Sequence, residues 1–172
     1  FLLLLRILGF FKKIAVFFGA RRKTRLAEKA RDALSSGLIE LAEGRFDKAE
    51  KLLLQQVKHS DNPLLAYLAA ARAAQQQDAH ERRDDYLRKA HTSTPTAEIA
   101  IGLTKAELQL AHSQYEQALA TLTLLYELAP KHAYVLKLLG KTYQLLSDWE
   151  KLKGLLSEIK KQGVLSTEKM LS

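Results

Sequence analysis

Apolar side chains recur along this chain at spacings of three and four residues, the period of an α-helix. One segment carries Leu34, Leu38 and Leu41, and the segment after it carries Ala49 and Leu53. The same pattern returns further along, and no stretch shows the sustained alternation of apolar and polar residues typical of a strand. The pattern predicts an all-α protein made of helical hairpins.

A block of about 34 residues recurs four times, and five kinds of position align between the copies. These positions are a small residue, a turn residue, an aromatic-type residue, an acid and a leucine: Gly37, Ala71, Ala106 and Gly140; Gly44, Asp78, Ser113 and Ser147; Phe46, His80, Tyr115 and Trp149; Asp47, Glu81, Glu116 and Glu150; Leu53, Leu87, Leu122 and Leu156. The period and the aligned positions predict an α-solenoid of stacked helix–turn–helix repeats of the tetratricopeptide type. We place the repeats within residues 32–162, at about 30–62, 63–95, 96–130 and 131–162, with 163–172 starting a following helix.

The aligned positions have physical causes. Small residues are needed where the two helices of a hairpin approach closely. We expect the turn residues to cap the second helices through their side chains, each completed by an acid three residues later, and proline to begin two of the first helices. The expected caps are Asp78, Ser113 and Ser147 with Glu81, Glu116 and Glu150, and Asn62 and Thr94 before Pro63 and Pro95. Arg83 occupies a slot that alanine fills in other copies, so the register of the second repeat could slip by one residue.

Charge is distributed unevenly along the 172 residues. The net charge is +8, and all of this excess lies in residues 1–31. Basic and acidic side chains balance over residues 32–172, which argues against a nucleic-acid-binding repeat domain. The absence of cysteine excludes disulfides, thiolate metal sites and a cysteine nucleophile in this sequence.

The N-terminal segment predicts membrane attachment. Residues 1–5 are uninterrupted apolar residues, and the chain begins without methionine, so we interpret them as the end of a transmembrane helix of a longer protein. Residues 1–20 would comprise this end and an interfacial segment, and residues 21–31 a basic juxtamembrane linker helix. We expect residues 1–25 to contact anionic lipid through Arg6, Lys12, Lys13, Arg21, Arg22, Lys23 and Arg25. A signal peptide or a nucleic-acid-binding arm fits this order of charges and aromatic residues less well.

Together with this N-terminal segment, several runs of residues resemble the N-terminal part of the HemY family. They are GLIELAEGRFDKAEKL at 37–52, YLAAA at 67–71, AAQQ at 73–76, LQLA at 108–111, YELAPKH at 126–132 and LKLLGKTY at 136–143. The family comprises proteobacterial inner-membrane tetratricopeptide proteins tied to late haem biosynthesis. The resemblance implies two N-terminal membrane helices, a cytoplasmic repeat domain and a role as scaffold or regulator of haem-pathway enzymes.

Residues that could carry out catalysis are scattered. The five histidines are dispersed, and no two of them lie three or four residues apart. The glycines form no phosphate-binding loop. We therefore expect no enzyme activity, no metal and no cofactor. Two other functions stay open: a membrane-anchored repeat adaptor in another envelope process such as lipopolysaccharide assembly, and an enzyme or haem carrier.

The expected binding site is a groove lined by the first helices of the repeats, because stacked hairpins curve and present these helices on the concave side. Positions one and four after the small residue, and three before it, should face inward. They are Arg72, Gln75, Glu107, Leu110, Lys137, Lys141 and Gln144, with Tyr134 near the rim. This mixture of basic, amide and aromatic residues suits an extended or helical segment of a partner protein.

Overall fold

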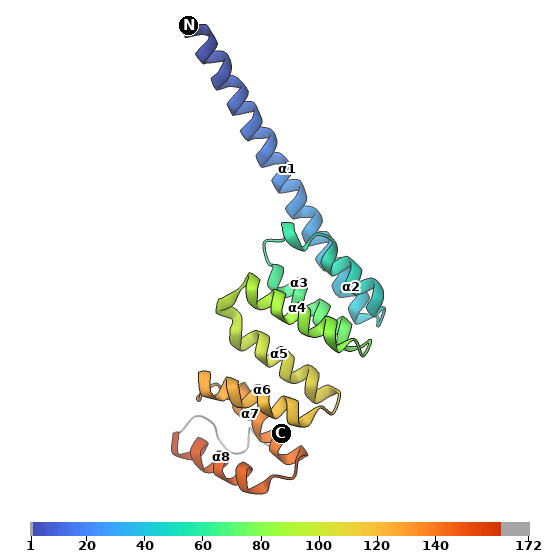
Figure 1. Cartoon of the computed structure of the whole chain (residues 1–172), viewed down its shortest axis with the longest axis vertical. Helices are drawn as coiled ribbons and strands as arrows, with labels where there is room; N and C mark the ends of the chain where they lie inside the picture. The colour runs from blue at the N-terminus through green and yellow to red at the C-terminus, as the bar shows by residue number, and fades with distance from the viewer. Residues whose placement is uncertain (1, 163–172) are drawn as a thin grey trace. The chain divides into compact units, whose positions relative to one another are not determined.

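The computed structural model describes the backbone of residues 2–162 and the side chains of residues 21–160. The chain divides into two compact units, residues 1–93 and 94–172. Every regular element in the described part is helical, which confirms the all-α prediction (Figure 1).

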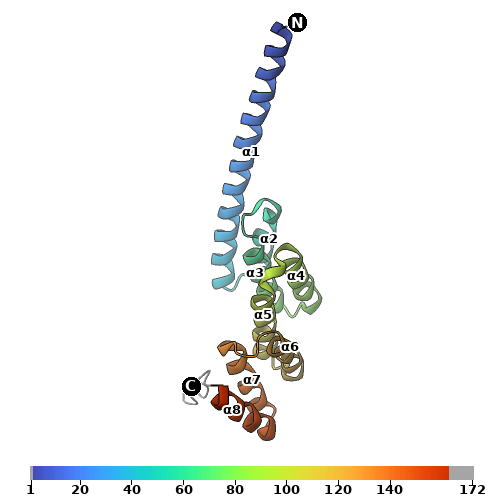
Figure 2. The ribbon, with the colours of Figure 1, turned by 90° about the vertical axis from the view of Figure 1, so that its left-hand side faces the viewer.

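The first unit contains two antiparallel helical hairpins (Figure 2). Helix α1 (Leu2–Ala42) packs against α2 (Phe46–Gln55), and a 3-10 turn, η1 (Val57–His59), leads to the second hairpin. That hairpin consists of α3 (Pro63–Gln75) and α4 (His80–Ser93). Helix α1 is unbroken, so one helix runs through the segments in which the sequence predicted a membrane end, a linker and the first repeat helix.

The second unit also contains two hairpins. A 3-10 turn, η2 (Pro95–Ala97), precedes α5 (Glu98–Ala111) and α6 (Tyr115–Leu128), and these are followed by α7 (Ala133–Leu145) and α8 (Trp149–Gln162). Helices α5 and α6 pack together, and α7 packs against both α6 and α8. A core of aliphatic side chains from α5 to α8 holds this unit together, formed by Ala106, Leu122, Leu125, Val135, Leu136, Leu138, Leu139, Leu155 and Ile159.

Burial confirms the apolar faces inferred from the sequence. Ala71 and Ala106 are fully buried at the helix contacts. A Cβ added to Gly37 would lie 2.7 Å from Cγ of Leu53, so glycine is required there for α1 to approach α2. The repeated leucine is buried in three copies, while Leu156 is partly buried beside the core of the second unit.

The turn residues serve a different purpose from the one predicted. Gly44, Asp78, Ser113 and Ser147 have positive φ angles of 77°, 54°, 58° and 56°. Each follows the end of a first helix, and the next residue donates its backbone N–H to a carbonyl five residues back, as from Arg45 to Glu40 at 2.9 Å. This is the Schellman arrangement, in which one left-handed residue ends the helix.

The predicted side-chain caps are therefore wrong for two of the second helices. Helix α6 begins after Gln114 and has no side-chain cap. In the last hairpin, Asp148 rather than Ser147 caps the helix, because its Oδ1 accepts from the N–H of Lys151 at 3.2 Å. Before α3, the predicted cap Asn62 is confirmed, accepting from the N–H of Leu65 at 3.3 Å. Thr94 makes no such side-chain cap before η2.

The left-handed turn leads to a test at Ser147. Ser147→Gly should be more stable than Ser147→Ala by about 1 kcal/mol, because only glycine lacks the Cβ that makes a left-handed conformation costly. Chemical denaturation of the two variants measures this difference. A helix cap would also favour glycine over alanine, so the comparison with the unchanged chain decides: Ser147→Gly should be more stable than that chain under the Schellman assignment and less stable if Ser147 were a cap.

Candidate functional site

A hollow of about 380 Å³ lies in the second unit between α5, the start of α6 and α7. Its size falls in the range of small binding pockets. The residues that line it are Glu107, Leu110, Ala111, Tyr115, Tyr134, Leu138, Lys141 and Leu145.

The lining combines apolar side chains with a few polar groups. The hydroxyl of Tyr134 donates to Oε1 of Glu107 at 2.8 Å, which connects α7 to α5 across the hollow. Tyr134 and Leu145 are each 42% exposed, and Lys141 is exposed as well. An apolar surface beside a cation and a hydrogen-bonded acid can bind a peptide segment that has both apolar and polar side chains.

Four of the predicted groove residues meet in this hollow: Glu107, Leu110, Tyr134 and Lys141. The half-buried Lys137 and Gln144 are not among its lining residues. At about 100° per residue they lie on one side of Lys141 around α7, whereas Tyr134 and Leu138 lie on the other.

In the first unit the prediction is wrong for Gln75. Arg72 is exposed on α3, but Gln75 is fully buried and cannot line an open groove. Its Oε1 accepts from Nη1 of Arg83 at 2.6 Å. Arg83 is only 4% exposed and also bonds Asp84 at 2.9 Å, so the register of α4 holds with arginine in the small-residue slot. Gln75 serves as the buried acceptor that this arginine requires.

The sequence reasoning missed four residues of the hollow. Tyr115 belongs to the repeated aromatic position, and this position could have signalled its role because it starts the second helix beside the end of the first. The others, Ala111, Leu138 and Leu145, carry no signal that separates them from ordinary core residues.

The basic residues predicted to contact lipid lie in the N-terminal part of α1. Arg21, Arg22, Lys23 and Arg25 are all exposed. The other predicted lipid contacts, Arg6, Lys12 and Lys13, are outside the residues whose side chains the structure describes, and residues 163–172 are outside its described backbone. No helix in the described range combines the length and apolar character that a membrane crossing requires.

Comparison with known proteins identifies the N-terminal region. Residues 1–78 match the family model described as HemY protein N-terminus. This region belongs to the HemY N-terminal family. The chain is also 30% identical over 148 residues to Protein HemY of Escherichia coli K12, of Escherichia coli O157:H7 and of Shigella flexneri. The aligned part covers 86% of this chain but 36% of each relative. No solved structure matches the chain significantly.

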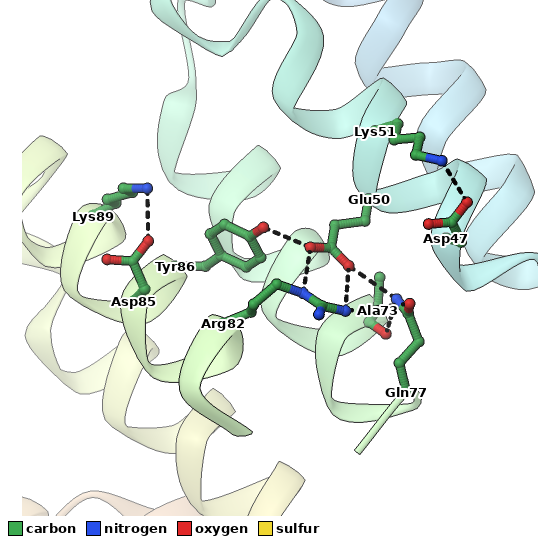
Figure 3. Close-up of polar contacts among 9 residues, drawn as sticks. All are labelled: Asp47, Glu50, Lys51, Ala73, Gln77, Arg82, Asp85, Tyr86 and Lys89. Carbon is green, nitrogen blue, oxygen red and sulfur yellow. Dashed lines mark hydrogen bonds and ion pairs between the residues drawn. The ribbon is translucent and has the colours of Figure 1, made fainter. Parts of the chain in front are cut away.

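The HemY-like first unit contains a buried polar cluster centred on Glu50 of α2 (Figure 3). Its carboxylate accepts from the hydroxyl of Tyr86 at 2.5 Å, from Nε of Arg82 at 3.0 Å and from Nε2 of Gln77 at 2.9 Å. Burial and the bond to Glu50 raise the pKa of Tyr86 well above its usual value of 10. Because its partners come from α4 and the turn before it, Glu50 joins the two hairpins.

The described part of this HemY relative offers no evident site for a metal. Among the described residues there is no group of three or more histidine, aspartate or glutamate side chains that could hold an ion. His132 uses Nδ1 to accept from the N–H of Val135 at 3.4 Å, and so caps α7. The Nδ1 atom of His132 is therefore already used in a hydrogen bond to the backbone.

A second, smaller hollow of about 160 Å³ lies between α6, α7 and α8 and is lined in part by Tyr126 and Glu158. A hydrogen bond to Glu158, together with burial, raises the pKa of Tyr126 to about 12. Because the folded state favours the neutral phenol, this contribution to stability is complete below pH ~10 and is lost as the pH rises toward 12.

The raised pKa of Tyr126 can be tested by alkaline titration of the tyrosines. Tyr126→Phe should remove one late-titrating phenol from the tyrosinate absorbance curve and leave the curve near pH ~10 unchanged. Tyr67→Phe, which changes a tyrosine outside both hollows and the Glu50 cluster, serves as the control. Loss of signal near pH ~10 in the Tyr126 variant would contradict the hydrogen bond to Glu158.

Proposed function

We propose that this chain is part of a membrane-anchored tetratricopeptide scaffold that acts in a late step of haem biosynthesis by binding other proteins. The similarity to Protein HemY over 86% of the chain carries this proposal, because it supports a role in the process with which the family is associated. The matched relatives are much longer, so the part they share with this chain would supply the anchor and the first repeats.

Anchoring is assigned to residues 1–25. The apolar residues before Arg21 and the exposed basic residues after them favour attachment at the inner membrane. Lysine and arginine next to a membrane segment are retained on the cytoplasmic side, so we place the repeats there. The attraction of anionic lipid for these residues would add about 1 kcal/mol for each cation near the surface.

Partner binding is assigned to the hollow between α5 and α7. It offers exposed apolar surface at Tyr134 and Leu145, a cation at Lys141, and an acid, Glu107, that is hydrogen-bonded to Tyr134. We propose that the domain binds haem-pathway enzymes and has no catalytic activity of its own.

Photo-crosslinking tests this function in cells. Tyr134 is replaced by a photoreactive benzoylphenylalanine in the full-length membrane protein, and crosslinked partners are identified by mass spectrometry. We expect haem-pathway enzymes to be enriched at least tenfold, because the side chain lies in the hollow and is 42% exposed. Adding Lys141→Glu should reduce this crosslinking several-fold if the cation contributes to binding.

The same probe at Leu124 provides the matched control. Leu124 is 61% exposed on α6, and it does not line the hollow. Equal recovery of haem-pathway enzymes from both positions, or recovery from neither, would contradict the proposed function.

A further inference from the structure

We infer that the first hairpin stands end-on to an anionic lipid surface, with the η1 end facing the lipid and the α1–α2 turn facing away. This inference rests on the proposed membrane anchoring and adds an orientation to it. The surface that faces the lipid comprises the exposed basic cluster of α1 (Arg21, Arg22, Lys23 and Arg25) together with Lys58 and His59 of η1.

The first step is the continuity of α1. A single helix, Leu2–Ala42, carries the basic residues and then packs against α2. It contains no proline, the residue that most often kinks a helix, and its Gly37 is packed against Leu53. The position of the basic segment therefore fixes the orientation of the hairpin.

The second step is the arrangement of cations around α1. At about 100° per residue, Arg21, Arg25, Arg22 and Lys23 lie at roughly 0°, 40°, 100° and 200° around the helix axis. All four are exposed, so they surround more than half of the helix within five residues. A helix lying flat on a membrane would place its cations along one side, whereas one that passes through the headgroup layer can use cations on several sides.

The third step is the height of η1 along this helix. Nη2 of Arg31 bonds Oδ2 of Asp61 at 2.6 Å, which places the bend after η1 beside Arg31. Arg31 lies six to ten residues after the basic cluster, or about 9–15 Å along the axis. The distance from the basic cluster to Arg31 is therefore equal to, or somewhat longer than, the roughly 8–10 Å over which salt screens the attraction between charges.

The basic residues at positions 21–25 supply the net positive charge at this end of the hairpin, because Lys29, Arg31 and Lys58 are matched by Glu28, Asp32 and Asp61. Lys58 and His59 are exposed, and so is Lys29 on α1. Of the nearby acids, Asp61 is paired with Arg31, whereas Glu28 and Asp32 are exposed on α1. The opposite end of the hairpin, at Ala42, lies about 16 Å further along α1 than Arg31.

Depth-dependent fluorescence quenching tests the orientation. Because the chain has no cysteine, Lys58→Cys and Ala42→Cys each introduce a single labelling site at an exposed position. The labelled full chain is reconstituted into phosphatidylcholine–phosphatidylglycerol vesicles that carry a headgroup quencher in both leaflets. We expect quenching at position 58 to exceed that at position 42 several-fold. Insertion of four glycines after Glu28 should remove this difference, because it uncouples the hairpin from the basic segment.

The outcomes separate the orientation from the anchoring. Equal quenching at positions 42 and 58, or stronger quenching at 42, overturns the inference while the chain still floats with the vesicles. A difference that persists after the glycine insertion also overturns it, because α1 would not then set the orientation. Failure of the chain to float with these vesicles overturns the anchoring itself.

Discussion

Glu50→Ala is expected to lower the free energy of unfolding by about 3 kcal/mol. Glu50 is only 9% exposed, and its carboxylate accepts hydrogen bonds from Tyr86, Arg82 and Gln77 (Figure 3). Its removal leaves the buried Tyr86 hydroxyl without this acceptor. Arg82 is half exposed, so water replaces part of what it loses. Urea denaturation of the chain in a mild detergent, followed by circular dichroism, measures the change.

Asp47→Ala on the same helix is the matched control. Asp47 forms an ion pair with Lys51 at 2.7 Å, but both side chains are about three-quarters exposed. Its loss should change stability by less than about 0.5 kcal/mol. If Glu50→Ala also costs less than about 1 kcal/mol, the cost of burying the carboxylate must cancel its hydrogen bonds, and the cluster does not join the hairpins.

Leu122→Ala should destabilise the second unit by about 3–4 kcal/mol, which places it among the most costly single changes in this chain. Leu122 is fully buried among Ala106, Leu125 and Leu136, and truncation leaves a cavity that the surrounding helices fill only partly. Leu138 belongs both to this core and to the lining of the hollow. We therefore expect the variant to lose crosslinking at Tyr134 as well as stability.

Leu124→Ala, two residues along the same helix, tests whether the burial of Leu122 causes the loss of stability, because it makes the same change at an exposed leucine. Leu124 is 61% exposed, so its truncation should change stability by no more than about 0.5 kcal/mol. Thermal unfolding of both variants makes the comparison. Similar losses from the two substitutions would show that the packing of α6 differs from that described.

The hollow shows how far sequence reasoning reached into the candidate site. The repeat alignment identified Glu107, Leu110, Tyr134 and Lys141, because residues on one helix face recur at predictable offsets from the small residue. It could not separate Lys137 from Lys141, since both occupy offsets expected to face inward and only the position of α5 decides which one borders the hollow.

Gln75 shows where the same reasoning fails. Its repeat-equivalent in the third copy, Leu110, lines the hollow, whereas Gln75 is buried. The reason lies on the neighbouring helix, where Arg83 replaces a small residue and brings a guanidinium into the hairpin interior. A buried guanidinium needs a buried acceptor, and this requirement is visible only when both helices are in place.

The sequence by itself determined the helical hairpins, the small residues at their contacts and the leucines of their cores, because these follow from local periodicity and side-chain volume. It also located the excess positive charge before the repeats. Tertiary structure alone decided that the turn residues are left-handed and that Glu50 collects donors from another hairpin. It also decided that α1 continues without a break into the first hairpin. These features depend on the direction in which each helix leaves its turn and on partners distant in sequence, which no local pattern encodes.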